Sequence, residues 1–496
     1  MAETTPTSKA FRPSLGLLDG TMIVAGSMIG SGIFIVSANI TQNVGSAGWL
    51  IFVWLITGFM TIVAAVSYGE LSGMYPKAGG QYVYLKEAFN PLTGFLYGWS
   101  FFSVIQTGTI AAVAVAFCKF AGTFWPSLEL NDNNILLQVG KLKVHYAELV
   151  AILLILFLTW VNTRGIRTGK TIQTVFTVTK LLSLLGLVVF GLLLGARSEI
   201  WHQNWTGGWH IQRLIQADGG GGIVGSSPLI GLAIFGAIAA SMTGSIFSSD
   251  AWNNVTFIAG EMKNPKRNIG LSLFLGTLIV SVIYISCNLM YVSVMPMQQI
   301  ATAPQGRVAT VAANLIFGHD GTYVIAVMIM ISTFGCINGL VLAGARVSYT
   351  MAGDRLFFKE AGKLNRNAVP GWALWAQGIV ACVLCLSGTY NDLLTMIAFV
   401  AVAFYALTVI GIFVLRRKAP QLDRPYKAFA YPVLPAVYVV LALVFCVALI
   451  IQSPQYSTGG LIIVLVGIPL YYLAVVAGRA PRSEGATGPA ERPARN

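Results

Sequence analysis

Apolar residues along this chain fall into long runs that are separated by short polar connections. A run of about 20 apolar residues is long enough to cross the hydrocarbon core of a bilayer as a helix. The pattern predicts twelve such spans and therefore an all-α integral membrane protein. We place them at about residues 15–40, 47–73, 91–124, 146–163, 170–195, 228–259, 268–295, 321–353, 370–388, 390–416, 431–452 and 457–478.

The composition supports this class. Of 496 residues, 56% are hydrophobic and only 10% are charged, whereas soluble domains carry about 25% charged residues. The first span is interrupted by glycine and has no small-residue cleavage site behind it. We therefore do not expect a removable signal peptide.

The net charge of +13 is explained by where the basic residues lie. In the connections on the side of the termini there are 24 lysines and arginines, against six in the connections on the other side. Cytoplasmic connections are enriched in Lys and Arg, so we expect both termini in the cytoplasm and no nucleic-acid partner. Residues 479–496, rich in Pro, Gly and Arg, are expected to form a disordered tail.

Cysteine, histidine and catalytic motifs give no sign of a metal, a cofactor or an enzyme. All six cysteines fall within apolar runs, and the four histidines, all in outer connections, lack the spacing of metal ligands. The sequence has no H-E-x-x-H, and Gly220–Ser227 lacks the lysine of a phosphate-binding loop. We predict a membrane protein that is not an enzyme.

The first span contains three glycines and two serines between Gly26 and Gly32. Each glycine weakens a helix by about 1 kcal/mol relative to alanine. One interpretation is close helix packing, because Gly26 and Gly30 form a G-x-x-x-G. The other is local unwinding, which is tolerated at membrane depth where the freed backbone lines a ligand site.

The sixth span carries a second interruption, from Phe247 to Asn254, with an acid at Asp250. An intramembrane carboxylate costs about 2.5 to 3.5 kcal/mol on insertion scales, so it needs a reason. Asp250 is either an internal cap on free backbone amides or part of a binding site. Because the two breaks are five spans apart, we predict two five-helix repeats in inverted orientation, with a site between discontinuous helices 1 and 6.

Lys180 lies about ten residues inside the span at 170–195, too deep for its ammonium group to reach the membrane surface easily. A buried ammonium binds carbonyl oxygens or loses its proton. Two functional roles follow: a fixed cation in place of bound sodium, or a site that exchanges a proton. Snorkelling to the cytoplasmic face is the purely structural interpretation.

The two breaks suit a ligand that carries a negative and a positive group. Amides at a half-helix end bind a carboxylate, free carbonyls bind an ammonium, and glycine lets the backbone approach closely. An α-amino acid has both groups on one carbon. An ion channel or a nutrient sensor of the same fold are the rival classes, because glycine-rich breaks also build ion filters and a sensor binds the same ligands.

Several motifs resemble the amino acid-polyamine-organocation superfamily, and within it the L-amino-acid transporter family and the bacterial alanine-serine-cysteine exchangers. These motifs are Gly26-Ser-Met-Ile-Gly-Ser-Gly-Ile-Phe34, Tyr75-Pro-Lys-Ala-Gly-Gly-Gln-Tyr-Val-Tyr84, Asp250-Ala-Trp-Asn253, Gly260-Glu-Met-Lys-Asn-Pro-Lys-Arg-Asn268 and Phe334-Gly-Cys-Ile-Asn-Gly339 with Arg346. The resemblance implies a LeuT-type five-plus-five inverted repeat with two additional helices. It also implies a multi-pass protein of a bacterial plasma (inner) membrane.

We therefore expect an N-terminal segment at residues 1–13, repeats at 14–195 and 228–417, an extracellular loop at 196–227 and two further helices at 418–478, before the tail at 479–496. By position, the resemblance implies that Gly30, Ser31 and Gly32 hold the substrate carboxylate. The main-chain carbonyls of Met28, Phe247 and Ser248 would hold its amino group. Phe247 would also be the outer gate, with Asp250 and Asn253 near the substrate and Lys180 in the coupling role.

Two positions depart from the family. Animal members pair with a heavy chain through a cysteine between spans three and four, and Pro126–His145 contains none, so we expect no disulfide-linked heavy chain. Many members have glycine or alanine in place of Asp250, which leaves neutral and cationic substrates both open. We predict sodium-independent exchange of small or neutral L-amino acids; the alternative is a proton-coupled permease that accepts cationic ones.

Overall fold

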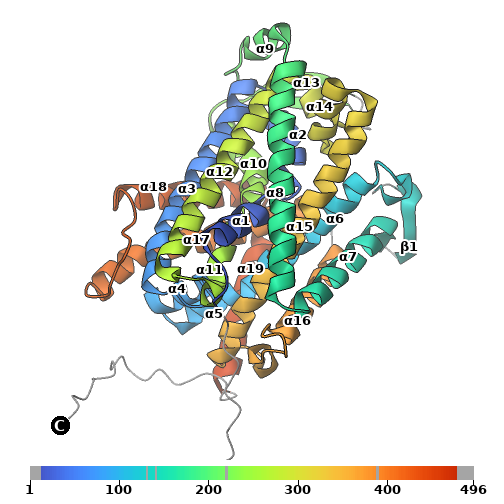
Figure 1. The fold of residues 1–496 in the computed structure, drawn as a ribbon. Helices are drawn as coiled ribbons and strands as arrows, with labels where there is room; N and C mark the ends of the chain where they lie inside the picture. The colour runs from blue at the N-terminus through green and yellow to red at the C-terminus, as the bar shows by residue number, and fades with distance from the viewer. Residues whose placement is uncertain (1–12, 130–131, 140–141, 218–221, 387–389, 477–496) are drawn as a thin grey trace, which may run out of the picture.

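The computed structural model describes residues 13–129, 132–139, 142–217, 222–386 and 390–476. The predicted tail at 479–496 and nearly all of the predicted segment at 1–13 lie outside these residues. Figure 1 shows long helices side by side, with short elements gathered at the two ends of the bundle.

Nine continuous helices within the described residues are long and apolar enough to cross a membrane. They comprise α3 (Ala47–Met74), α5 (Pro91–Ser100) continued by the π-helix η1 (Phe101–Ile105) and α6 (Gln106–Ala121), α7 (Tyr146–Thr163), α8 (Ile166–Phe190) with the π-helix η4 (Gly191–Gly195), α12 (Pro265–Val294), α15 (His319–Gly353), α17 (Tyr390–Lys418), α18 (Val433–Gln452) and α19 (Pro454–Val476). This confirms the prediction of an all-α membrane protein.

The other three predicted spans have shorter or broken counterparts. The first is a pair of helices, α1 (Leu17–Met28) and α2 (Gly32–Val44), bent by 43° at their junction. The sixth is α10 (Leu232–Ser248) followed by α11 (Asn254–Phe257), and the ninth is α16 (Gly371–Cys385). Twelve spans and an inverted repeat remain predictions, because length and composition alone assign fewer helices to the membrane.

Short elements connect the long helices. Figure 1 shows α9, α13 and α14 at one end of the bundle and α4 and α11 toward the other. The short helices are α4 (Gln81–Ala88), α9 (Ser198–Trp205), α13 (Met297–Ala301) and α14 (Val308–Phe317), and the 3-10 turns are η2 (Pro126–Leu128), η3 (Asp132–Asn134), η5 (Ala259–Glu261), η6 (Pro304–Gly306) and η7 (Lys359–Gly362). Two antiparallel hairpins, β1 (Ile135–Val139) with β2 (Leu142–His145) and β3 (Gln212–Gln216) with β4 (Ile223–Pro228), occupy the two predicted outer loops.

Small residues let the central helices approach closely. A Cβ built on Gly270 of α12 would lie 3.4 Å from the Cα of Gly69 on α3. One built on Gly276 would lie 2.5 Å from a methyl carbon of Val24 on α1. Lipid tails are as apolar as the helices, so the hydrophobic effect does not drive helices together within a membrane. Close packing at small residues stabilises their association instead. These glycine contacts hold α12 close to both α1 and α3.

Candidate functional site

The first break separates α1 from α2 by three residues, and all of them are buried. Helix α1 ends at Met28, and Ile29 leaves the helical region with φ −75° and ψ 89°. A Cβ on Gly26 would lie 2.1 Å from the side-chain nitrogen of Gln173 on α8, so this glycine permits close packing. Both interpretations of the glycine-rich segment therefore apply, since Gly26 packs against α8 and the chain unwinds after Met28.

Lys180 binds the first break directly. Its side chain is fully buried, and Nζ donates to the main-chain oxygens of Gly26 at 2.6 Å and Ile29 at 2.7 Å. The main-chain oxygen of Ser332 on α15 lies 3.4 Å from the same nitrogen. Snorkelling is therefore not the conformation of Lys180. The ammonium joins α8 to α1 and to the unwound segment.

The second break separates α10 from α11. Helix α10 ends at Ser248, and its last turn closes with the Ser249 amide donating to the Ser245 oxygen at 3.0 Å. Ala251 then adopts φ +63°, in the left-handed region that side-chain-bearing residues rarely occupy. The sixth span is discontinuous at Phe247–Asn254, where the sequence predicts it.

Tyr284 of α12 joins the two breaks. Its hydroxyl lies 3.1 Å from the Met28 oxygen and 3.0 Å from the Ser248 oxygen. A Cβ on Gly32 would lie 1.9 Å from Oγ of Ser248, so only glycine lets the breaks come this close. One hydroxyl proton is shared between the two carbonyls, and the Met28 oxygen also accepts from the Gly30 amide at 2.9 Å, so the remaining accepting capacity lies mainly on the Ser248 oxygen.

Two of the carbonyls that are predicted to bind the substrate, those of Met28 and Ser248, therefore lie on either side of the Tyr284 hydroxyl. Gly32 packs against the side chain of Ser248. Gly30 and Ser31 lie in the same buried segment, and a Cβ on Gly30 would lie 3.2 Å from Sγ of Cys336. No sequence signal distinguished Tyr284, because a tyrosine in an apolar helix most often serves packing.

The side chains of Asp250 and Asn253 form hydrogen bonds with residues of α17 and α4, away from the two breaks. The Asp250 carboxylate accepts from the Tyr405 hydroxyl of α17 at 2.5 Å. Asn253 donates to the side-chain oxygen of Gln81 on α4 at 2.9 Å. The cavity beside Asp250 has a volume of about 20 Å³, enough for about one water molecule. A substrate side chain reaches Asp250 only if these helices move.

A larger cavity opens between α2 and α10, with a volume of about 460 Å³. Its lining includes the polar side chains of Asn39, Gln42 and Thr243. Residues of η6, which follows α13 in the chain, also line it. Gly244 lines it as well, one helical turn before Phe247. Phe247 is only 6% exposed, at the end of α10. The cavity therefore approaches the breaks from the end of the bundle that carries α13 (Figure 1).

The opposite end is closed by backbone and side-chain contacts. The amides of Ser14 and Leu15 donate to the Glu261 oxygen at 2.9 and 3.0 Å, and the Lys263 amide donates to the Leu15 oxygen at 2.8 Å. The Glu261 carboxylate pairs with Nε of Arg346 at 3.0 Å, with side chains 3% and 1% exposed. The start of α1 is thus tied to the segment that follows α11.

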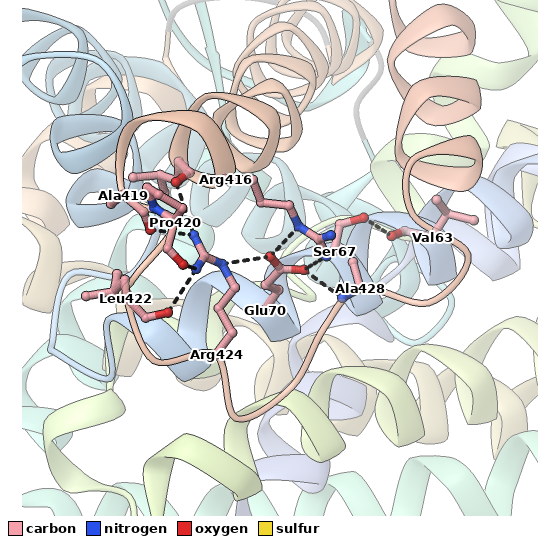
Figure 2. Close-up of polar contacts among 10 residues, drawn as sticks. Val63, Ser67, Glu70, Arg416, Ala419, Pro420, Leu422, Arg424 and Ala428 are labelled. Atoms are coloured by element: carbon pink, nitrogen blue, oxygen red, sulfur yellow. Dashed lines mark hydrogen bonds and ion pairs between the residues drawn. The ribbon is translucent and has the colours of Figure 1, made fainter.

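Figure 2 shows a second buried ion cluster, around Glu70 of α3. Arg416 donates to both Glu70 oxygens at 3.0 and 2.7 Å, the Ala428 amide donates at 2.7 Å, and Nε of Arg424 lies 3.5 Å away. The Glu70 side chain has no exposed surface. No prediction from the sequence included this cluster, although the sequence carries a signal for it, since Glu70 is the one acid in the apolar run at 47–73.

Comparison with known proteins gives a match over nearly the whole chain. The family described as amino acid permease matches residues 15–475. The b(0,+)-type amino acid transporter 1 of Mus musculus is 26% identical over 473 residues, covering 94% of this chain and 88% of that protein. The large neutral amino acids transporter small subunit 2 of Homo sapiens is 27% identical over 481 residues, covering 95% and 82%. The b(0,+)-type transporter 1 of Rattus norvegicus is 28% identical over 480 residues, covering 95% and 90%.

Proposed function

Because this chain belongs to the amino acid permease family, and so is a membrane transporter rather than an enzyme, we propose that it exchanges small or neutral L-amino acids without sodium. The observation that supports this most is the binding of Lys180 Nζ to the Gly26 and Ile29 carbonyls. A fixed ammonium at this place supplies the positive charge that a bound sodium ion would otherwise bring to the break.

The substrate lies, in this proposal, between the two breaks. Its carboxylate binds at Gly30, Ser31 and Gly32, and its ammonium binds the carbonyls of Met28, Phe247 and Ser248. The accepting capacity left on the Ser248 oxygen, beside the Tyr284 hydroxyl, supports this arrangement. An ammonium brings three donors, so it binds several carbonyls at once.

Uptake into proteoliposomes that contain the purified full-length chain tests exchange. Radiolabelled L-alanine, L-leucine and L-arginine are offered in sodium-free buffer to vesicles loaded with unlabelled amino acid or left empty. We expect uptake of alanine or leucine that requires internal amino acid. Sodium-dependent uptake into empty vesicles would contradict the proposal.

A proton-coupled permease is the second candidate, and the environment of Lys180 supports it. Within the part of the chain that the structure describes, the hydrogen-bond partners of its ammonium are main-chain oxygens, with no carboxylate among them. An ammonium with no counter-charge is suited to release a proton. Uptake into empty vesicles that an imposed proton gradient drives would assign this function instead.

We propose that Phe247 closes the substrate site toward the cavity between α2 and α10. Phe247→Ala is expected to lower the exchange rate by about tenfold while substrate affinity changes less, because the ring covers the site without binding the charged groups. Binding is measured by scintillation proximity, and exchange in vesicles. Phe235→Ala is the matched control, since Phe235 lies on the same helix with 60% of its surface exposed. Equal exchange rates in wild type and Phe247→Ala would show that Phe247 is not a gate.

Asp250→Asn separates neutral from cationic substrates. Because an amide oxygen can still accept from the Tyr405 hydroxyl, we expect exchange of L-alanine to stay within about fivefold of wild type. Loss of L-arginine inhibition alone would place Asp250 in the side-chain pocket. Unchanged affinity for both amino acids would make Asp250 a cap of the broken helix. Tyr405→Phe is the matched control, because it removes the partner and keeps the acid.

We further propose a multi-pass protein of the plasma membrane, with both termini in the cytoplasm and no disulfide-linked heavy chain. The name of the human relative describes it as a small subunit, and this name applies to that relative alone. Here five of the six cysteines are buried, and Cys382, within α16, is half-buried. This placement supports a chain without a covalent partner.

A further inference from the structure

A long apolar groove runs along the outside of the bundle, where α3, α12 and the segment before α18 meet. Its volume is about 980 Å³, at the upper end of the range for ligand sites. Most of its lining is aliphatic or aromatic. Its lining includes the apolar side chains of Phe59, Val66, Phe274 and Phe429 and the basic side chains of Lys266 and Arg267.

The groove is open to the surroundings of the bundle. Phe59, Phe274 and Phe429 line it while 41%, 38% and 70% of their surfaces are exposed. Phe59 and Phe274 lie on the membrane-spanning helices α3 and α12, where exposed aromatic side chains face lipid tails. The apolar part of the groove is therefore accessible to an acyl chain.

One end of the groove is basic. Lys266 and Arg267 line it at the start of α12, next to α11. Lys266 pairs with Asp423 at 3.1 Å, and both side chains are exposed. Arg267 is exposed too, and no side-chain hydrogen bond or ion pair of Arg267 occurs among the described residues. A free guanidinium at the end of an apolar groove suits a phosphate that is attached to a hydrocarbon chain.

The wall formed by residues 425–434 is held in place from inside the protein. The Ala428 amide and Arg424 both bind the buried Glu70 carboxylate (Figure 2). The ring of Tyr426 lies 3.1 Å from a Cβ built on Gly69. The groove is therefore preformed, and its ligand does not have to order this segment.

We propose that the groove binds one anionic phospholipid, with an acyl chain along Phe59, Val66 and Phe274 and the phosphate at Arg267 and Lys266. The lipid comes from the leaflet on the α11 side, which the predicted topology makes cytoplasmic. This inference does not depend on the transported substrate.

Native mass spectrometry of the full-length chain in detergent tests the site, with phosphatidylglycerol or phosphatidylcholine added at equal concentrations. We expect one phosphatidylglycerol per chain bound more tightly than phosphatidylcholine. Arg267→Gln should weaken phosphatidylglycerol binding about fivefold, the factor that one basic residue contributes near an anionic surface. Val66→Trp, which fills the groove, should weaken binding of both lipids.

Arg417→Gln is the control, because Arg417 is exposed at the end of α17 and does not line the groove. Equal binding of the two lipids by the wild-type chain would indicate ordinary annular lipid and overturn the proposal. So would an equal loss of phosphatidylglycerol in Arg417→Gln and Arg267→Gln, or unchanged binding in both Arg267→Gln and Val66→Trp.

Discussion

Replacing Lys180 with methionine is expected to slow amino-acid exchange by about 100-fold or more. Methionine keeps an unbranched apolar stem but removes the ammonium that binds the Gly26 and Ile29 oxygens. Each charge-assisted hydrogen bond contributes about 1.5 to 3 kcal/mol, and two buried carbonyls lose their donor. The break then lacks the positive charge that holds its conformation. Exchange of radiolabelled L-alanine in sodium-free proteoliposomes measures the effect.

Two comparisons make this result specific. Lys263→Met removes a lysine whose side chain is exposed on the connection after α11, and its exchange rate should match wild type. Adding sodium to Lys180→Met should restore part of the flux if the ammonium stands in for a cation. Wild-type exchange kinetics in Lys180→Met would show that Lys180 has no role in coupling.

The second large effect is on stability, in Glu261→Gln. This change leaves the Arg346 guanidinium without a counter-charge, while the Arg346 side chain is only 1% exposed. Removing one partner of a buried ion pair destabilises a protein by about 3 to 5 kcal/mol. The variant should therefore unfold at a clearly lower temperature in detergent, and the contact between η5 and α15 should be the first to open. Thermal unfolding followed by tryptophan fluorescence measures the shift.

Asp423→Asn is the matched control for that experiment. It breaks the exposed pair with Lys266, and surface pairs contribute only about 0 to 1 kcal/mol. The double variant Glu261→Leu with Arg346→Met should recover much of the lost stability, because apolar side chains can replace a buried ion pair. A Glu261→Gln chain that unfolds at the wild-type temperature would show that the pair does not hold the closed end.

The sequence predicted features that follow from a single segment. Each apolar run became a helix where the run was long, and both breaks appear where glycine or polar residues interrupt it. Lys180 was identified because one charge deep in an apolar run must find partners. These signals are local, and the cost of placing a charge or free backbone groups in lipid makes them readable without a structure.

The features that the sequence did not predict depend on which helices become neighbours. Tyr284 bridges the breaks because α12 crosses both of them, and nothing in its own segment indicates this. The Asp250 carboxylate accepts from Tyr405, which lies 155 positions away and which the sequence does not single out. Partners at such separations are fixed by packing, so local patterns carry no information about them.

The Glu70 cluster has a consequence for how the chain is made. Glu70 and Arg416 are 346 positions apart. At about 5 to 20 residues per second, α3 leaves the ribosome roughly 20 to 70 s before its partner exists. During biosynthesis the acid therefore stands at the end of an inserted helix without its arginines. A chain whose synthesis stops before residue 416 keeps that unpaired acid, so the N-terminal part of this protein cannot complete its fold until α17 and the connection behind it arrive.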